Sequence, residues 1–234
     1  MNPVFVALDT TDLDYARQLA DRVRGHVGGI KLGLEFFNAH GPDGVRAFEG
    51  CGLPIFLDLK FHDIPNTVAG ACRAAAALGM DIEDGNTQRG GGAAMMRAAH
   101  EAVKSVNPAT KLIAVTMLTS LSDEDLPTVG LTPPVGSQVL RLASLTQQCG
   151  LDGVVCSAHE IATLRAELGD DFLLVVPGIR PAGAALGDQR RVMAPAEARD
   201  AGAGVLVVGR PITGAPDPAE AARRIAESLG ITAG

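Results

Sequence analysis

Eight short apolar runs alternate with helical stretches along the whole chain, and this alternation restricts the fold more than any other feature. Except for the fourth, the runs are rich in Val, Ile and Leu and have no polar face, as is typical of the strands of a parallel sheet covered by helices. No linker or change of composition interrupts the pattern over the 234 residues. The expected strands are residues 4–8, 28–33, 54–57, 80–92, 111–118, 153–156, 172–176 and 204–208.

Apolar residues at helical spacing follow each of these runs. In the first helix Asp12 is the expected cap, followed by apolar residues from Leu13 to Val23. Eight strand–helix units over this length fit a (β/α)8 TIM barrel of the α/β class better than an open sheet. We therefore expect one domain, residues 1–234. The later helices are expected at residues 34–51, 68–78, 93–106, 135–149, 158–168, 196–201 and 217–229.

Charge and composition exclude several classes of partner. The net charge of −7 disfavours nucleic acid and anionic membranes, although a few clustered cations could still bind a small anion. No apolar run approaches the ~18 residues of a membrane span, and no signal peptide is visible. The four cysteines form no CxxC pair, which favours reduced thiols in a cytoplasmic protein over disulfides or metal ligands.

Polar residues recur at or just beyond the carboxyl ends of six of the expected strands. In TIM barrels this is the face where active sites are built. A single charge there would usually be a solvated loop residue, but a set drawn from six strands indicates a common site. The set is Asp9, Lys31, Asp58, Lys60, Thr119, Arg180 and Arg210.

One cluster within this set alternates cations and anions. Asp58 and Lys60 are two residues apart and should project from the same face of their strand. With Lys31 and Asp63 they would make an array that fixes side chains and shifts pKa values. Its ammonium groups could donate a proton and its carboxylates could repel an anionic substrate group. A purely structural ion-pair network is the alternative.

A second cluster lies after the last two strands. It comprises Gly178, Arg180, the polar loop that contains Gln189, Gly209 and Arg210. Barrels commonly bind phosphate in this region through backbone N–H groups and a helix N-terminus. Arg210 could hold a phosphate through two parallel hydrogen bonds, and the loop could close over the ligand. An ordinary surface loop is the alternative for the loop itself.

The segment Asp58–Val68, DLKFHDIPNTV, resembles the signature of the orotidine 5′-phosphate decarboxylase family. A bare DxKxxD is shared by related sugar-phosphate barrels, whereas the continuation into Ile64-Pro65-Asn66-Thr67 is highly specific. Further matching segments span the chain, at residues 8–9, 30–33, 114–120, 153–157, 177–180, 187–191 and 208–213.

The resemblance implies a homodimeric TIM barrel that uses no cofactor and no metal. Such an enzyme decarboxylates orotidine 5′-phosphate to UMP, the last step of de novo pyrimidine biosynthesis. By the same resemblance, Lys60 protonates C6 as CO2 leaves, Asp58 lies against the substrate carboxylate, and Lys31 holds the array and a ribose hydroxyl.

The resemblance also assigns the remaining site residues. Asp9 would bind the ribose and Thr119 would face the pyrimidine. Asp63 and Thr67 would reach across the dimer interface into the partner's site. The phosphate and the closed lid would be held by Arg180, Gln189, Gly209 and Arg210.

Residues 80–92 depart from the family pattern. Family members have an apolar strand with a histidine near its end, whereas this stretch has no histidine and is slightly too long. Glu83, Asp84 and Asn86 are poor residues for a buried strand. We expect either a distorted strand or an altered sequence here. Because the stretch lies outside the charged array, the expected function is unchanged.

Two other functions remain open. A metal-dependent sugar-phosphate decarboxylase or aldolase shares DxKxxD, but it would need another carboxylate ligand near the site. A barrel that binds a nucleotide phosphate without catalysis would follow if the unusual fourth strand disabled the enzyme. His62 is expected to be structural rather than a general acid, because a lysine already fills that role.

Overall fold

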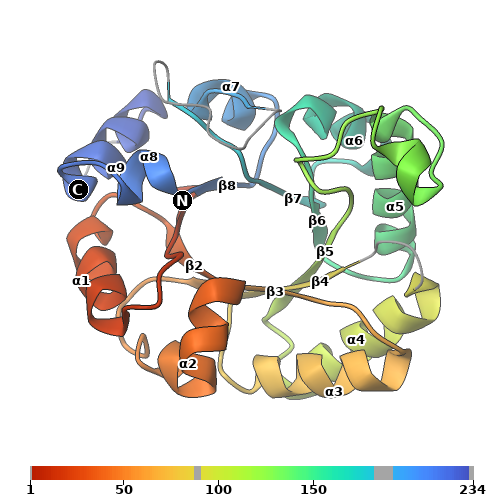
Figure 1. The fold of residues 1–234 in the computed structure, drawn as a ribbon, viewed down its shortest axis with the longest axis horizontal. Helices are drawn as coiled ribbons and strands as arrows, with labels where there is room; N and C mark the ends of the chain where they lie inside the picture. The colour runs from red at the N-terminus through yellow and green to blue at the C-terminus, as the bar shows by residue number, and fades with distance from the viewer. Residues whose placement is uncertain (1, 87–90, 182–191, 232–234) are drawn as a thin grey trace.

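A computed structural model describes residues 2–86, 91–181 and 192–231. In this part of the chain, eight parallel strands form a closed barrel in the order β1 to β8, and helices surround it (Figure 1). The expected TIM barrel is therefore confirmed. The strands are β1 Val4–Ala7, β2 Gly29–Gly33, β3 Ile55–Phe61, β4 Ile82–Asn86, β5 Lys111–Val115, β6 Gly153–Val155, β7 Leu173–Val176 and β8 Val205–Val208.

The helices follow the apolar spacing of the sequence. Asp12 caps the first helix as expected, since its carboxylate accepts a hydrogen bond of 2.9 Å from the Tyr15 N–H. The α-helices are α1 Leu13–Val23, α2 Leu34–Arg46, α3 Pro65–Ala76, α4 Gly92–Val106, α5 Val135–Gln148, α6 Ile161–Leu168, α7 Pro195–Asp200, α8 Arg210–Thr213 and α9 Pro218–Ser228. Two 3-10 turns also form: η1 Leu126–Val129, which was not expected, and η2 Ala158–Glu160, which is the start of the helix expected at residues 158–168.

Strand residues alternate between two apolar cores. Val4 and Val6 of β1 face outward and pack in the large core between strands and helices. Phe5 and Ala7 belong to a separate cluster inside the barrel, together with residues such as Phe56. This inner apolar cluster lies beneath the carboxyl ends of the strands, where it forms a floor.

The unusual fourth unit does form a strand, shorter than the expected 80–92. β4 pairs with β5 in continuous register from Ile82 opposite Lys111 to Asn86 opposite Val115. The irregularity lies on its other side, where the β3–β4 register shifts between Leu57 and Phe61 of β3. The distortion expected for β4 is therefore found in its pairing with β3, next to the charged motif.

Two further differences concern the carboxyl ends of strands. β5 ends at Val115 rather than at residue 118, so Leu118 and Thr119 lie in the following loop. The single turn α8, which carries Arg210, was not expected because four residues show no helical periodicity.

Within the described residues, no helix has both the length and the apolar character needed to cross a membrane.

Candidate active site

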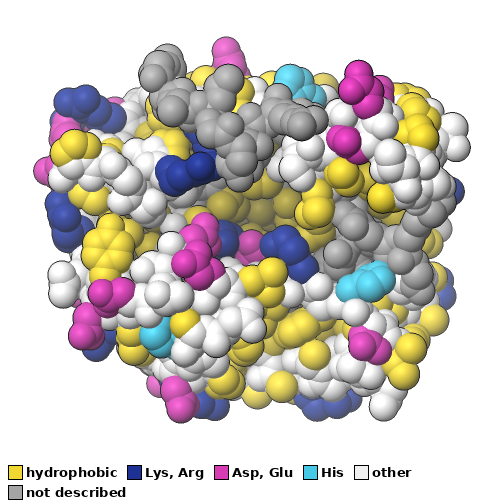
Figure 2. Space-filling view, viewed as in Figure 1, with side chains coloured by type: hydrophobic (Ala, Val, Ile, Leu, Met, Phe, Trp, Pro, Cys, Tyr) yellow, Lys and Arg dark blue, Asp and Glu magenta, His cyan; other side chains and the backbone are white. Residues whose placement is uncertain are grey.

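A cavity of about 350 Å³ opens at the carboxyl ends of the barrel strands. Figure 2 shows acidic and basic side chains around a hollow with apolar walls in the middle of this face. Its apolar floor includes Ala7, Phe56 and Val207 from the inner barrel core. The polar and charged lining residues are Asp9, Lys31, Asp58, Lys60, Thr119, Arg180, Arg210 and Thr213.

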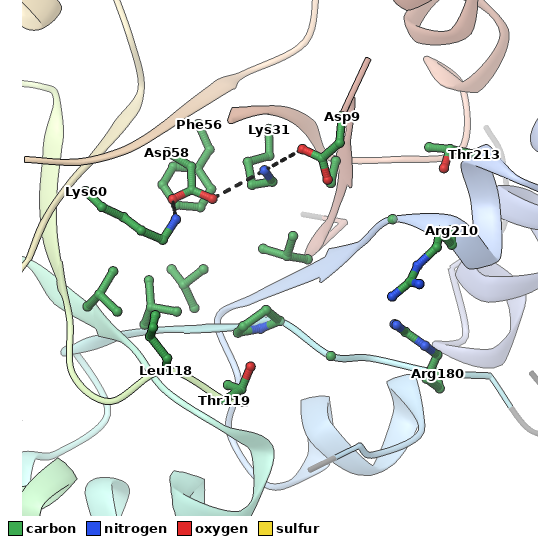
Figure 3. Close-up of a pocket in the computed structure, with 18 of the residues that line it drawn as sticks. Asp9, Lys31, Phe56, Asp58, Lys60, Leu118, Thr119, Arg180, Arg210 and Thr213 are labelled. Atoms are coloured by element: carbon green, nitrogen blue, oxygen red, sulfur yellow. Dashed lines mark hydrogen bonds and ion pairs between the residues drawn. The ribbon is translucent and has the colours of Figure 1, made fainter. Parts of the chain in front are cut away.

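Two lysines and two carboxylates form an alternating chain along one wall (Figure 3). Lys60 Nζ forms an ion pair with Asp58 Oδ1. The other oxygen, Asp58 Oδ2, lies 3.3 Å from Lys31 Nζ, which also donates a 3.0 Å hydrogen bond to Asp9 Oδ1. Asp58 thus lies between two cations, and Lys31 between two anions.

Lys31 is the most deeply buried of these four charged residues, with only 7% of its surface exposed to solvent. Burial lowers the pKa of Lys31, but the carboxylates of Asp58 and Asp9 together raise it by more. The net pKa lies above the ordinary value of 10.5. Lys31 is therefore a permanent cation at neutral pH that holds the two carboxylates in place.

The backbone at Lys60 has an uncommon conformation. Its φ of 53° lies in the left-handed region, and no other non-glycine residue in the described part of the chain has a positive φ. This conformation costs a side-chain-bearing residue about 1–2 kcal/mol. It lies within the register shift of β3, so the chain leaves regular strand geometry where the Lys60 side chain turns toward Asp58.

Two arginines lie at the far end of the cavity. Figure 3 shows the guanidinium groups of Arg180, after β7, and Arg210, on α8, pointing toward the same space. Arg180 is only 9% exposed, and its Nη1 donates a 2.9 Å hydrogen bond to the Ile179 carbonyl. Two converging guanidinium groups make a site suited to a doubly charged anion such as a phosphate monoester.

The cavity brings together most of the residues expected from the sequence. Thr119 and Gly209 line it as well. Asp63 and Thr67 are exposed and are not among its lining residues, and the Asp63 carboxylate accepts a 2.6 Å hydrogen bond from the Ile64 N–H. The array expected from the sequence included Asp63 as its second carboxylate. The array in the structure has Asp9 instead. Gln189 and the expected lid lie outside the described residues.

Sequence reasoning gave no site role to ten lining residues, among them Leu118, Pro177 and Thr213. Leu118 and Pro177 immediately precede residues that were selected as polar or glycine positions at strand ends, so their position was the available signal. Thr213 belongs to the unexpected turn α8, and its signal was its place in the segment 208–213, which resembles the family pattern.

No three His, Cys, Asp or Glu side chains are grouped to hold a metal ion within residues 2–86, 91–181 and 192–231. The two carboxylates in the cavity, Asp9 and Asp58, both accept from lysine ammonium groups. The polar chemistry offered by the described residues is thus ammonium, carboxylate, hydroxyl and guanidinium.

Comparison with known proteins shows the family of the chain. The family model described as "Orotidine 5'-phosphate decarboxylase / HUMPS family" matches residues 2–225. Orotidine 5'-phosphate decarboxylase of Rhodospirillum rubrum is 58% identical over 97% of this chain and 94% of its own length. That of Paramagnetospirillum magneticum is 52% identical over 99% of this chain and its own full length.

A solved structure gives the same relationship. The crystal structure of orotidine 5'-phosphate decarboxylase from Lactobacillus acidophilus superposes with a TM-score of 0.85 at 38% identity, covering 98% of this chain and 99% of that one. The family model, the relatives and this superposition all cover nearly the whole chain. The chain therefore belongs to the orotidine 5'-phosphate decarboxylase / HUMPS family.

Proposed function

We propose that this protein converts orotidine 5′-phosphate to UMP and CO2 in de novo pyrimidine biosynthesis, without a cofactor or a metal. The observation that carries the proposal is the arrangement of the cavity. The alternating array Lys60–Asp58–Lys31–Asp9 lines one wall, and two arginines converge at the far end. Because the array and the arginines lie in different parts of the cavity, the base and the phosphate of a nucleotide would each have a separate binding region.

The reaction requires a stabilised carbanion and a proton. When the bond between C6 and the carboxylate carbon breaks, CO2 leaves and the electron pair stays on C6. The Lys60 ammonium stabilises that charge and donates a proton to C6, which gives UMP. The neutral amine then regains a proton from solvent. Asp58 lies beside the substrate carboxylate, where repulsion is relieved as CO2 departs.

The other cavity residues bind the remote parts of the substrate. Arg180, Arg210 and Gly209, with Gln189 of the lid, hold the phosphate, and Asp9 and Lys31 bind ribose hydroxyls. Thr119 faces the pyrimidine. Binding energy from the phosphate offsets the unfavourable approach of the substrate carboxylate to Asp58.

The protein acts as a cytoplasmic homodimer. Asp63 and Thr67 complete the site of the partner subunit. Their exposure in one chain supports this role, since both are available to a second copy. The DLKFHDIPNT motif then serves two sites, with Asp58 and Lys60 acting in their own chain.

The test follows the loss of orotidine 5′-phosphate absorbance by the purified protein, with and without EDTA, and identifies UMP as the product. Equal turnover in both conditions is expected. Turnover that EDTA abolishes would indicate a metal-dependent enzyme of the same barrel. Binding of UMP without any turnover would indicate a non-catalytic nucleotide-binding barrel.

A further inference from the structure

Gly33 lies at the carboxyl end of β2, two residues after Lys31, and is buried. Because alternate strand residues share a face, a side chain at position 33 would point the same way as that of Lys31. Gly33 also lies opposite Asp58 in the β2–β3 register. The position is therefore directly beside the charged array.

A Cβ atom at position 33 would collide with the array. It would lie 2.6 Å from Lys31 Nζ and 3.1 Å from Asp9 Oδ1. No backbone atom lies within 4 Å of it among its three nearest neighbours, which are all atoms of these two side chains. The space left by the missing side chain is thus the space in which the Lys31 ammonium meets Asp9.

The backbone gives no other reason for a glycine here. Its φ of −100° and ψ of −170° are extended values that any residue adopts. Gly33 is also the N-cap of α2, where it makes no side-chain capping bond. Ser, Asp or Asn would cap this helix, and each is better than glycine at an N-cap by a few tenths of a kcal/mol. Local stability therefore favours a side chain that the array excludes.

We propose that Gly33 is a positioning residue for decarboxylation: its lack of a side chain lets the Lys31 ammonium lie between Asp9 and Asp58. An alanine there would push the end of the lysine away from one or both carboxylates. Asp58 would lose one of its two cations and with it a fixed orientation toward Lys60. The expected loss of turnover rests on the proposed function. The expected displacement of the Lys31 ammonium does not.

The kinetic experiment is a double-mutant cycle of Gly33→Ala and Lys31→Ala, measured as kcat/KM for orotidine 5′-phosphate. Gly33→Ala should fold, because the atom it displaces is the flexible end of a lysine, and should lose about 10- to 100-fold in kcat/KM. In the Lys31→Ala background the same substitution should cost less than about twofold, because the ammonium is gone. Equal losses in both backgrounds, or no loss in either, would overturn the proposal.

Two other glycines provide matched controls. Gly29 is on the same strand, but its Cβ would meet the Phe5 ring at 2.3 Å, so Gly29→Ala should lower the melting temperature and act independently of Lys31→Ala. Gly136, on α5, has no atom within 4 Å of the added Cβ, so Gly136→Ala should leave activity unchanged and should not lower stability, because alanine is the better helix former.

A second readout does not depend on turnover. Titration of the lysine side chains by NMR should show Lys31 with a raised pKa in the wild-type protein and a pKa closer to the ordinary value in Gly33→Ala. If the wild-type protein fails to decarboxylate the substrate but this change occurs, the proposed function is wrong and the role of Gly33 in placing the ammonium stands. An unchanged Lys31 titration in Gly33→Ala would refute that role.

Discussion

Lys31 Nζ lies 3.3 Å from Asp58 Oδ2, on the side of the carboxylate opposite Lys60. Asp58 is therefore held from both edges and cannot rotate away from the cavity without losing an ion pair. A negative charge fixed in this way can repel a substrate carboxylate only if the substrate is held from elsewhere. The two arginines across the cavity are the described groups best placed to supply that force.

Two substitutions of Lys60 distinguish the role of its positive charge from its role as a proton donor. Lys60→Ala should reduce kcat by about 10⁴-fold or more, because it removes the group proposed to be both the cation beside C6 and the proton donor. Lys60→Arg keeps a cation, but a guanidinium does not give up its proton. We expect it to be equally inactive. UMP binding, measured by calorimetry, should persist in both variants, and near-normal turnover in either one would contradict the assignment.

Replacing Lys31 tests the raised pKa of its ammonium. A folded-state pKa above the unfolded value means that the stabilisation by Lys31 is complete below about pH 10.4 and is lost as pH rises through the folded-state pKa. Lys31→Met should lower the free energy of unfolding by about 2–3 kcal/mol. This is slightly less than for a typical buried pair that loses one partner, because Lys60 still pairs with Asp58.

Urea unfolding of both proteins at several pH values provides the measurement. The difference between wild type and Lys31→Met should stay constant from pH 6 to pH 9 and shrink only in strongly alkaline solution. A difference that already disappears between pH 6 and pH 9 would mean that the Lys31 pKa is lowered by burial rather than raised by Asp9 and Asp58.

The phosphate role of Arg210 predicts a loss that depends on the substrate. Arg210→Ala should reduce kcat/KM for orotidine 5′-phosphate by about 10- to 100-fold, the value of one or two hydrogen bonds to a charged group. Its effect on orotidine, which lacks the phosphate, should be small. Arg224→Ala removes an exposed arginine paired with Glu220 on α9 and should change neither. Equal losses on both substrates in Arg210→Ala would place Arg210 outside the phosphate site.

A second charged cluster lies at the opposite, amino-terminal end of the strands, where it affects stability and not catalysis. Asp152 accepts hydrogen bonds from the Leu112 N–H at 2.9 Å and from Lys104 and Lys111 at 3.1 and 3.2 Å. Burial raises the pKa of Asp152, but these donors and the lysine charges lower it by more, so the net pKa is below its ordinary value. Its stabilisation is present above about pH 3.9 and is lost as pH falls through the folded-state pKa.

Asp152→Asn should therefore lower the free energy of unfolding by about 1 kcal/mol at pH 7, with normal kcat/KM. Denaturant unfolding at pH 7 and pH 3 checks this, and the difference from wild type should be smaller at pH 3. Asp200→Asn, at an exposed pair with Arg199, is the control and should have little effect at either pH. A larger difference at pH 3 than at pH 7 would mean that the carboxylate is not the stabilising form.

The barrel and most of the site were predictable because they depend on local patterns. Apolar runs fix the strands, and the carboxyl ends of parallel strands share one face, which places Lys31, Asp58 and Arg210 together. The positive φ of Lys60 was not predictable, since it accompanies a register shift that depends on how β4 pairs with β3. The ion pair of Lys31 with Asp9 was not predicted either, although both residues were selected as site residues, because it depends on side-chain positions across the neighbouring strands β1 and β2.

The expected contribution of Asp63 to the partner's site can be tested by mixing two impaired proteins. Asp63→Ala and Lys60→Ala homodimers should each be strongly impaired. In a mixed dimer, the Asp63→Ala subunit keeps its own Lys60 and receives Asp63 from its partner, so one of the two sites is intact. Random exchange makes half of the dimers mixed, which predicts recovery of about one quarter of wild-type activity. If Asp63 served its own chain, both sites of the mixed dimer would carry a defect and mixing would restore nothing.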